Sequence, residues 1–274
     1  MIDATRPQKK AQFGIPGLDD VTSGGLAEGH LFLLEGSPGT GKTTIALQFL
    51  LEGEKVGETG LYITLSETEN ELRIGAASHG WTIGALTKVF ELVPPEALFS
   101  PDQTQTLLYS SDLELGEATK AIFDQVELVK PQRVVLDSLS EIRLLAQSSL
   151  RYRRQILALK HYFARSGATV LMLDDLTSEA TDKTVHSVAH GVIHLEGIAP
   201  DYGAERRRLK VSKYRAQSFR GGYHDFTISG EGSRFSRAWC QRSTELVSSA
   251  RVSQAVRLSS TTCWVAASKP VQAP

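Results

Sequence analysis

The sequence is poor in cysteine, with only Cys240 and Cys263 among its 274 residues. Two cysteines are too few for a disulfide framework or for a zinc site built on thiolates, so we expect neither. The scattered histidines show no metal-ligand spacing either. We interpret four scattered histidines as structural: His161, His186, His190 and His194.

Long apolar runs and a strong net charge are also missing. No apolar run approaches the roughly 18 residues of a transmembrane helix, so we expect no membrane partner. Residues 1–13 are polar and lack the apolar core of a signal peptide, which favours a cytoplasmic location. The formal net charge of −1 excludes a global field that would draw the chain to nucleic acid or to a membrane surface.

The residues that are present favour a globular α/β fold. The hydrophobic content of 41% is typical of a packed core. Continuous apolar runs predict strands at residues 31–34, 60–65, 88–93, 133–137 and 168–173. Helical spacing of apolar residues predicts helices at 44–54, 68–79, 113–130 and 148–166. Continuous strands that alternate with helices indicate a mostly parallel sheet with helices on both faces.

The pattern changes after residue 191. Segments 192–195, 206–214 and 222–228 follow one another as strands without intervening helices, which predicts an antiparallel extension at one sheet edge. Residues 94–111 form a polar loop. Beyond residue 236 the chain is rich in Ser, Ala and Thr. We therefore predict an arm at 1–11, one domain at 12–235 and a disordered tail at 236–274.

Residues 36–43 read Gly-Ser-Pro-Gly-Thr-Gly-Lys-Thr, which is a complete phosphate-binding loop between a predicted strand and a predicted helix. Glycines allow several backbone N–H groups to point at one anion, Lys42 reaches the β- and γ-phosphates, and the Thr43 hydroxyl can bind Mg²⁺. The sequence thus predicts a site for a nucleoside triphosphate. The predicted contact residues are Gly36, Ser37, Pro38, Gly39, Thr40, Gly41, Lys42, Thr43 and Thr44.

Three further segments carry a family resemblance. They are the glycine-rich stretch 14–29, the strand end Tyr-Ile-Thr-Leu-Ser-Glu-Thr at 62–68, and Lys-Tyr-Arg at 213–215, which Gly-Gly-Tyr and Phe-Thr-Ile follow. With the phosphate loop, they resemble the KaiC family of RecA-like ATPases over about residues 12–229. The resemblance implies a RecA-like P-loop NTPase fold that corresponds to one KaiC-type domain, with ATP and Mg²⁺ as cofactors.

The resemblance also implies roles for two carboxylates. Asp137 ends the apolar strand 133–137 and stands at the Walker B position, which holds Mg²⁺. Glu67 stands where these ATPases place the residue that orients and deprotonates the attacking water. The family usually has two adjacent glutamates here, and this chain has Ser66 in place of the first. The alternative interpretations are helix or turn capping for both carboxylates.

Lys213 and Arg215 stand two positions apart on a predicted strand, so their side chains share one face. In the family this pair reaches across a subunit interface to the γ-phosphate of a neighbour, which implies a homo-oligomeric ring, expected to be a hexamer. An exposed basic strand face, next to the three arginines at 206–208, is the alternative. The family usually has a glycine after this arginine, whereas here Ala216 follows.

Two other segments have alternative interpretations. His79-Gly80-Trp81 resembles the family's segment near the adenine, but a core tryptophan after a helix end fits equally well. Asp174 and Asp175 end a strand where RecA-like proteins place a polar sensor of the γ-phosphate, and a solvated loop is the alternative.

The leading functional hypothesis is a KaiC-like ATPase with a regulatory role and an unknown regulatory protein partner. Serine/threonine autokinase activity ranks lower, because the phosphorylated Ser-Thr pair of the clock protein aligns with His186-Ser187 and leaves one hydroxyl. A RecA/RadA-like DNA-dependent ATPase would need basic loops, and the loops 147–154 and 177–184 are of mixed character. We therefore do not expect nucleic acid as a partner. The last hypothesis is a scaffold that binds ATP without hydrolysing it, because Ser66 stands in place of a glutamate.

Overall fold

The structure is a computed structural model that describes residues 9–92, 111–176, 184–199, 205–230 and 232–235. The described elements belong to one compact unit, Met1–Ser236. Most of the predicted polar loop 94–111 lies outside the described residues. So do the predicted tail 236–274, with both cysteines, and most of the loop 177–184.

The described strands form a nine-stranded sheet in the order β11-β10-β9-β8-β3-β7-β6-β4-β5, besides a small β1-β2 pair. Six strands run parallel: β3 (Leu31–Gly36), β4 (Gly60–Thr64), β5 (Thr87–Glu91), β6 (Arg133–Asp137), β7 (Thr169–Asp174) and β8 (Gly191–Ile198). The strands β9 (Arg206–Tyr214), β10 (His224–Ser229) and β11 (Gly232–Phe235) are antiparallel. The predicted parallel sheet with an antiparallel edge is confirmed.

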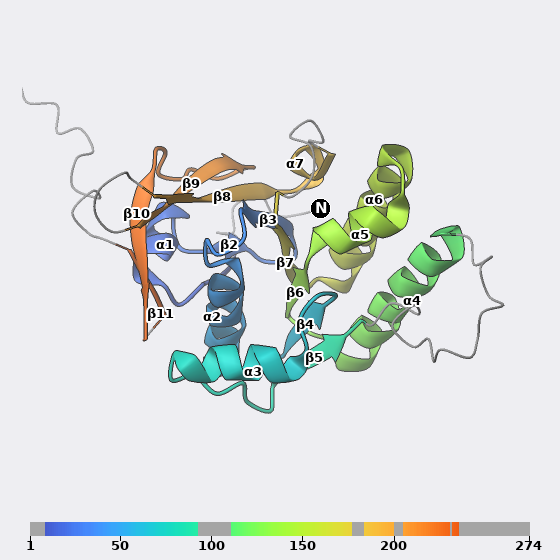
Figure 1. The fold of residues 1–274 in the computed structure, drawn as a ribbon, viewed down its shortest axis with the longest axis horizontal. Helices are drawn as coiled ribbons and strands as arrows, with labels where there is room; N and C mark the ends of the chain where they lie inside the picture. The colour runs from blue at the N-terminus through green and yellow to red at the C-terminus, as the bar shows by residue number, and fades with distance from the viewer. Residues whose placement is uncertain (1–8, 93–110, 177–183, 200–204, 231, 236–274) are drawn as a thin grey trace, which may run out of the picture. The chain divides into compact units, whose positions relative to one another are not determined.

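Helices cover both faces of the parallel strands (Figure 1). On one face, α1 (Pro16–Val21), α2 (Lys42–Lys55) and α3 (Glu69–Ser78) contribute to a first buried cluster. On the other, α4 (Ser111–Val129), α5 (Leu139–Ala146), α6 (Ser149–Ser166) and α7 (Thr184–Val188) contribute to a second. Apolar burial on both faces explains why these strands are continuous apolar runs. None of the described helices is long and apolar enough to cross a membrane.

Alternation along each strand decides which face a residue serves. On β3, Phe32 and Leu34 belong to the first cluster, whereas Leu31 and Leu33 belong to the second. Glu35 therefore points to the same face as α5, α6 and α7. This face is opposite to that of the phosphate-loop helix α2.

Several short elements were not predicted from the sequence. They are β1 (Lys10–Ala11), α1, β2 (Leu26–Ala27), α5, α7 and β11. The strand β1 falls inside the segment that we predicted as an arm. These residues form a strand because they pair with β2. The helix α2 begins at Lys42 rather than at residue 44, because Gly41 adopts a left-handed conformation (φ 100°) and ends the loop there.

Candidate functional site

The phosphate loop leaves the carboxyl end of β3 and enters α2 at Lys42. Two glycines are needed where the loop touches the antiparallel edge. A Cβ atom on Gly36 would lie 2.7 Å from the Leu195 carbonyl oxygen, and one on Gly41 would collide with the Ile228 side chain. The loop is therefore packed against β8 and β10. Glycine is needed at Gly36 because the backbone of β8 blocks a side chain there, and at Gly41 because its φ is 100°.

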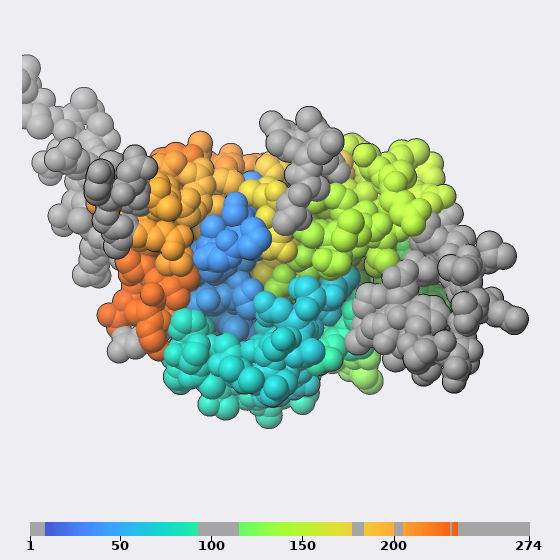
Figure 2. All heavy atoms as spheres, viewed as in Figure 1, coloured from blue at the N-terminus to red at the C-terminus, as the bar shows by residue number. Residues whose placement is uncertain are grey.

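A cavity of about 340 Å³ opens above the loop. Its lining residues are Pro38, Gly39, Gly41, Lys42, Thr43, Thr44, Ser66, Glu67, Asp137, Asp175 and Ile228. Most of the predicted nucleotide contacts, together with Glu67 and Asp137, thus meet in one place, whereas Gly36, Ser37 and Thr40 do not line it. In Figure 2 the blue atoms of this region lie at the surface between the orange antiparallel strands and the cyan segment.

Lys42 is satisfied within its own chain. Its Nζ donates to the carbonyl oxygens of Gly36 at 2.7 Å and Ser37 at 3.0 Å, and forms an ion pair with Asp175 Oδ1 at 2.9 Å. An ammonium group has three N–H donors, so all three are used. A phosphate that binds Lys42 must therefore displace at least one of these partners, and the Asp175 carboxylate is the anionic one.

Asp137 is buried at the end of β6 and accepts a hydrogen bond from the Tyr62 hydroxyl at 2.5 Å. Burial raises the pKa of Asp137, the bond from Tyr62 lowers it, and the neighbouring Asp175 raises it again. Asp137 and the Thr43 hydroxyl line the same cavity and are hard oxygen donors, which suits Mg²⁺. Among the described residues no group of three or more His, Cys, Asp and Glu could hold a metal, and Mg²⁺ needs only one or two protein ligands.

Glu67 reaches the cavity from the segment that follows β4. The Thr64 hydroxyl fixes this turn, since it donates to the Glu67 carbonyl at 2.7 Å and accepts from the Glu67 N–H at 2.9 Å. Burial raises the pKa of the Glu67 carboxyl, and Asp137, Glu71 and Asp175 raise it further. A half-buried carboxyl with a raised pKa beside a phosphate site suits a general base.

The capping interpretation of Glu67 is wrong. The N-cap of α3 is Thr68, whose side chain accepts a hydrogen bond from the backbone N–H of Glu71, while the Glu71 carboxylate accepts from the Thr68 N–H. This capping box occupies Thr68 and Glu71 and leaves Glu67 at the cavity. Ser66 also lines the cavity, in the position where the resemblance leads us to expect the first of two adjacent glutamates.

Lys213 and Arg215 do not line the cavity of their own chain. Lys213 Nζ donates to the carbonyl of His186 at 2.5 Å, and Arg215 Nη2 donates to that of Ser187 at 2.8 Å. Burial lowers the pKa of Lys213, and two cations, Arg215 and Lys160, lower it further. Both side chains reach the same helix, α7, as their spacing of two residues predicts.

The register of the sheet gives the distance along the strands between Lys213 and the phosphate loop. Gly36 pairs with Leu195, and Leu195 pairs with Leu209. Lys213 lies four residues further along β9, roughly 13 Å at about 3.3 Å per residue. This separation agrees with the absence of both residues from the lining of the cavity.

Ala216 has a left-handed backbone (φ 57°), at the position where the family usually has glycine. The turn after Arg215 is thus made with an alanine in the conformation that glycine adopts more easily.

Adjacent acidic residues at the tip of β7 have different environments. Asp174 is buried and forms an ion pair with Arg143 at 2.9 Å, whereas Asp175 reaches Lys42 in the cavity.

The segment His79-Gly80-Trp81, which resembles the family's segment near the adenine, lies away from the cavity. Trp81 packs against Gly232 of β11, and neither His79 nor Trp81 lines the cavity. This supports the core interpretation of Trp81.

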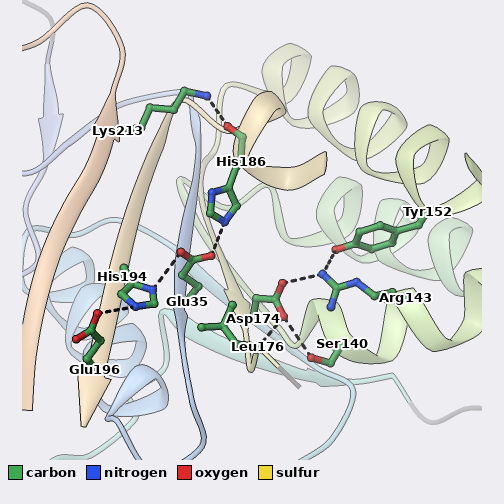
Figure 3. A network of polar contacts seen from close by, with 10 residues as sticks. All are labelled: Glu35, Ser140, Arg143, Tyr152, Asp174, Leu176, His186, His194, Glu196 and Lys213. Atoms are coloured by element: carbon green, nitrogen blue, oxygen red, sulfur yellow. Dashed lines mark hydrogen bonds and ion pairs between the residues drawn. The ribbon is translucent and has the colours of Figure 1, made fainter. Parts of the chain in front are cut away.

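Four side chains carry contacts that the sequence did not predict. Tyr62 binds Asp137, Ile228 forms one cavity wall, and His186 and His194 donate to Glu35 at 2.6 Å and 3.1 Å (Figure 3). Burial raises the pKa of Glu35, but the bonds from His186 and His194 outweigh it and hold that pKa at about 2. The orientation of Tyr62 could have been predicted from the sequence, because alternation along β4 places it on the same side as Thr64.

Comparison with known proteins agrees with the predicted family. The family model described as the KaiC ATPase matches residues 11–237. The circadian clock protein KaiC3 of Synechocystis sp. is 30% identical over 233 residues, which are 83% of this chain and 46% of KaiC3. The UPF0273 protein PH0284 of Pyrococcus horikoshii is 28% identical over 82% of this chain and 92% of its own length. This chain thus spans about half of the KaiC relative and nearly all of the archaeal one.

A solved structure shows the same fold. The KaiC-like protein PH0186 from Pyrococcus horikoshii OT3 superposes with a TM-score of 0.70 at 25% identity. The match covers 84% of this chain and 100% of the archaeal chain.

Proposed function

The chain belongs to the KaiC family of ATPases, and we propose that it binds Mg-ATP in the cavity above the phosphate loop and hydrolyses it between subunits of a homo-oligomeric ring. The observation that carries this proposal is the meeting of Lys42, Thr43, Asp137 and Glu67 in one cavity. Membership in an ATPase family implies nucleotide binding, and the residues of this chain suit it.

Each residue has a separate task in this proposal. Lys42 exchanges Asp175 for the β- and γ-phosphates, and the loop N–H groups bind the remaining phosphate oxygens. Thr43 and Asp137 hold Mg²⁺, which neutralises phosphate charge when bound. Glu67 takes the proton of the attacking water, for which its raised pKa is suited.

The ring is proposed from the placement of Lys213 and Arg215. Within the described part of the chain neither side chain has a carboxylate partner, and both bind carbonyl oxygens of α7. A cavity lined by three carboxylates and a separate basic pair are complementary in charge. In a ring, the basic pair of one subunit would stabilise charge on the γ-phosphate of the next.

The test is steady-state ATP hydrolysis with Mg²⁺ on protein sized by light scattering with and without ATP. We expect slow turnover by an ATP-dependent ring, at least a hundredfold lower turnover in Glu67→Gln, and the same loss in Arg215→Ala. A mixture of Lys42→Ala and Arg215→Ala chains should regain activity, because intact sites then face intact arginines. Turnover that survives in Glu67→Gln would refute the role of Glu67, and a mixture without recovery would refute the shared site.

A nucleotide-binding scaffold without hydrolysis is the second candidate, and the observation in its favour is Ser66 at the cavity. A ring that binds ATP without single-turnover hydrolysis would establish it. Autokinase activity ranks lower, because the Ser187 hydroxyl donates to the Thr184 carbonyl at 2.8 Å within α7. A hexamer, a regulatory protein partner and a cytoplasmic location stay predictions from the sequence.

A further inference from the structure

Helix α7 has contacts on two sides, and together they connect the phosphate loop with Lys213 and Arg215, the pair predicted to act on a neighbouring subunit. Figure 3 shows His186 between Glu35 and Lys213. The His186 side chain donates from Nε2 to Glu35 at 2.6 Å. The His186 carbonyl accepts from Lys213 at 2.5 Å, and the Ser187 carbonyl accepts from Arg215 at 2.8 Å. His186 therefore contacts Glu35 at one end of this connection and Lys213 at the other.

The Glu35 end of the connection is joined directly to the loop. Glu35 is buried, and the next residue, Gly36, offers its carbonyl to Lys42 at 2.7 Å. When Lys42 exchanges Asp175 for a phosphate, its Nζ moves, and its bond to the Gly36 carbonyl changes in geometry. This carbonyl belongs to the planar Gly36–Ser37 peptide, which the Gly36 Cα joins to the Glu35–Gly36 peptide, so the change is passed on to the Glu35 backbone. The hydrogen bond from His186 to the ionised carboxylate is the contact that passes this movement to α7.

Among the described residues, the Lys213 and Arg215 side chains are held by backbone oxygens of α7. The helix α7 has five residues, Thr184–Val188, so the carbonyls of His186 and Ser187 belong to its last turn and are available to outside donors. Lys213 and Arg215 bind these oxygens. A shift of α7 therefore shifts the positions of both charged groups.

We propose that His186 is a positioning residue that couples the occupancy of a subunit's own phosphate loop to the placement of its Lys213 and Arg215. The inference rests on the proposed function for its last step, in which the pair acts on the ATP of a neighbour. The coupling within one subunit needs only nucleotide binding. His186 itself touches neither nucleotide nor water in this proposal.

His194 provides a matched control. It donates from Nδ1 to the same Glu35 carboxylate at 3.1 Å, but it lies on β8 and its Nε2 faces Glu196 at 3.2 Å. Among the described residues the His194 side chain forms no hydrogen bond with α7, Lys213 or Arg215. Loss of His194 removes a donor from Glu35 and leaves the connection to the cations in place.

The first experiment is amide hydrogen exchange of the full chain, followed on a peptide that spans residues 184–190, with and without a non-hydrolysable ATP analogue and Mg²⁺. We expect nucleotide to change the exchange rate of the α7 amides about tenfold in the wild type and in His194→Phe. The change should be lost in His186→Phe and restored in His186→Gln, whose amide can donate from a similar position. Binding of the analogue is measured separately by calorimetry for every variant.

The second experiment is ATP turnover in mixtures of Glu67→Gln and Arg215→Ala chains, because the Glu67→Gln chain supplies the arginine and keeps an intact phosphate loop. His186→Phe added to the Glu67→Gln chain should lower the recovered kcat at least fivefold with unchanged KM. His194→Phe added in the same place should not. If nucleotide binds and α7 exchange does not respond in the wild type, or if it responds equally in His186→Phe, the inference is wrong whatever the turnover shows. If α7 responds as expected but the mixtures recover no activity, the coupling stands and the shared catalytic site fails.

Discussion

Asp175→Asn should increase the affinity for ATP, because the ion pair between Asp175 and Lys42 competes with phosphate. The two charged atoms are 2.9 Å apart, with the Lys42 side chain 6% exposed and that of Asp175 30% exposed. Asparagine has the same shape and keeps an oxygen that can accept from Lys42, so the substitution removes charge and little else. The same change removes repulsion between the carboxylate and the incoming phosphates.

The magnitude follows from the partial exposure of the pair. Exposed ion pairs contribute about 0.2–1 kcal/mol net, since screening and desolvation offset most of the Coulomb energy. One partner here is buried, so we take the upper end, about 1 kcal/mol, which corresponds to roughly fivefold in the dissociation constant. We expect Asp175→Asn to bind ATP about fivefold more tightly, with a difference that decreases as salt is raised.

The assay is calorimetric titration of wild type and variant with a non-hydrolysable ATP analogue and Mg²⁺ at two salt concentrations. Asp174→Asn is the matched control, because it is the same substitution one residue away, at a carboxylate that pairs with Arg143 on the other face. This control should lose stability in urea and keep its ATP affinity. Weaker binding by Asp175→Asn would refute the competition and would instead favour a role for Asp175 in holding the Mg-nucleotide.

Three further outcomes follow from the geometry. Ala216→Gly should raise the free energy of unfolding by about 1 kcal/mol in urea titrations, because Ala216 has a φ of 57°; equal or lower stability would contradict this. Gly41→Ala should weaken ATP binding in calorimetry, because alanine is strained at a φ of 100°, and adding Ile228→Ala should not restore it, because this strain does not depend on the Ile228 side chain. The pKa of Glu35 is about 2, below its ordinary 4.5, so its ionised form stabilises the fold above pH 4.5 and this contribution is lost as the pH falls towards 2. Glu35→Gln should therefore show a smaller loss of stability over that range than the wild type.

The parallel sheet was predictable because its strands are buried on both faces. Segment 133–137 has three consecutive apolar residues before its terminal aspartate, and β6 spans the same residues, Arg133–Asp137. The helix α5 was not predictable in this way, since its buried residues fall within only eight positions between two other elements. Segment 14–29 contains so many glycines that its short helix and strand were hidden in what reads as a series of turns.

The site was predictable where one short segment carries the chemistry, and less so where several elements meet. The phosphate loop is contiguous, so its residues could be named from the sequence. That Asp174 and Asp175 belong to opposite faces follows from alternation at a strand end, but the partners Arg143 and Lys42 come from distant helices. A site shared between chains cannot be read from one chain, because its second half is set by an assembly.

The sheet separates two sets of carboxylates, and β3 carries Glu35 of the second set and continues into the phosphate loop on the side of the first. On the side of α2, Asp137 faces the phosphate loop, while on the side of α7 the buried Glu35 holds His186. A phosphate at Lys42 acts directly on the first set. It can reach the second through the backbone at a strand end, because a packed sheet leaves no direct path between its faces. At the end of β3 this passage is short, because Glu35 directly precedes Gly36, whose carbonyl accepts from Lys42. A substitution that keeps ATP binding but uncouples α7 should therefore be found at His186 and Glu35, and not among the residues that line the cavity.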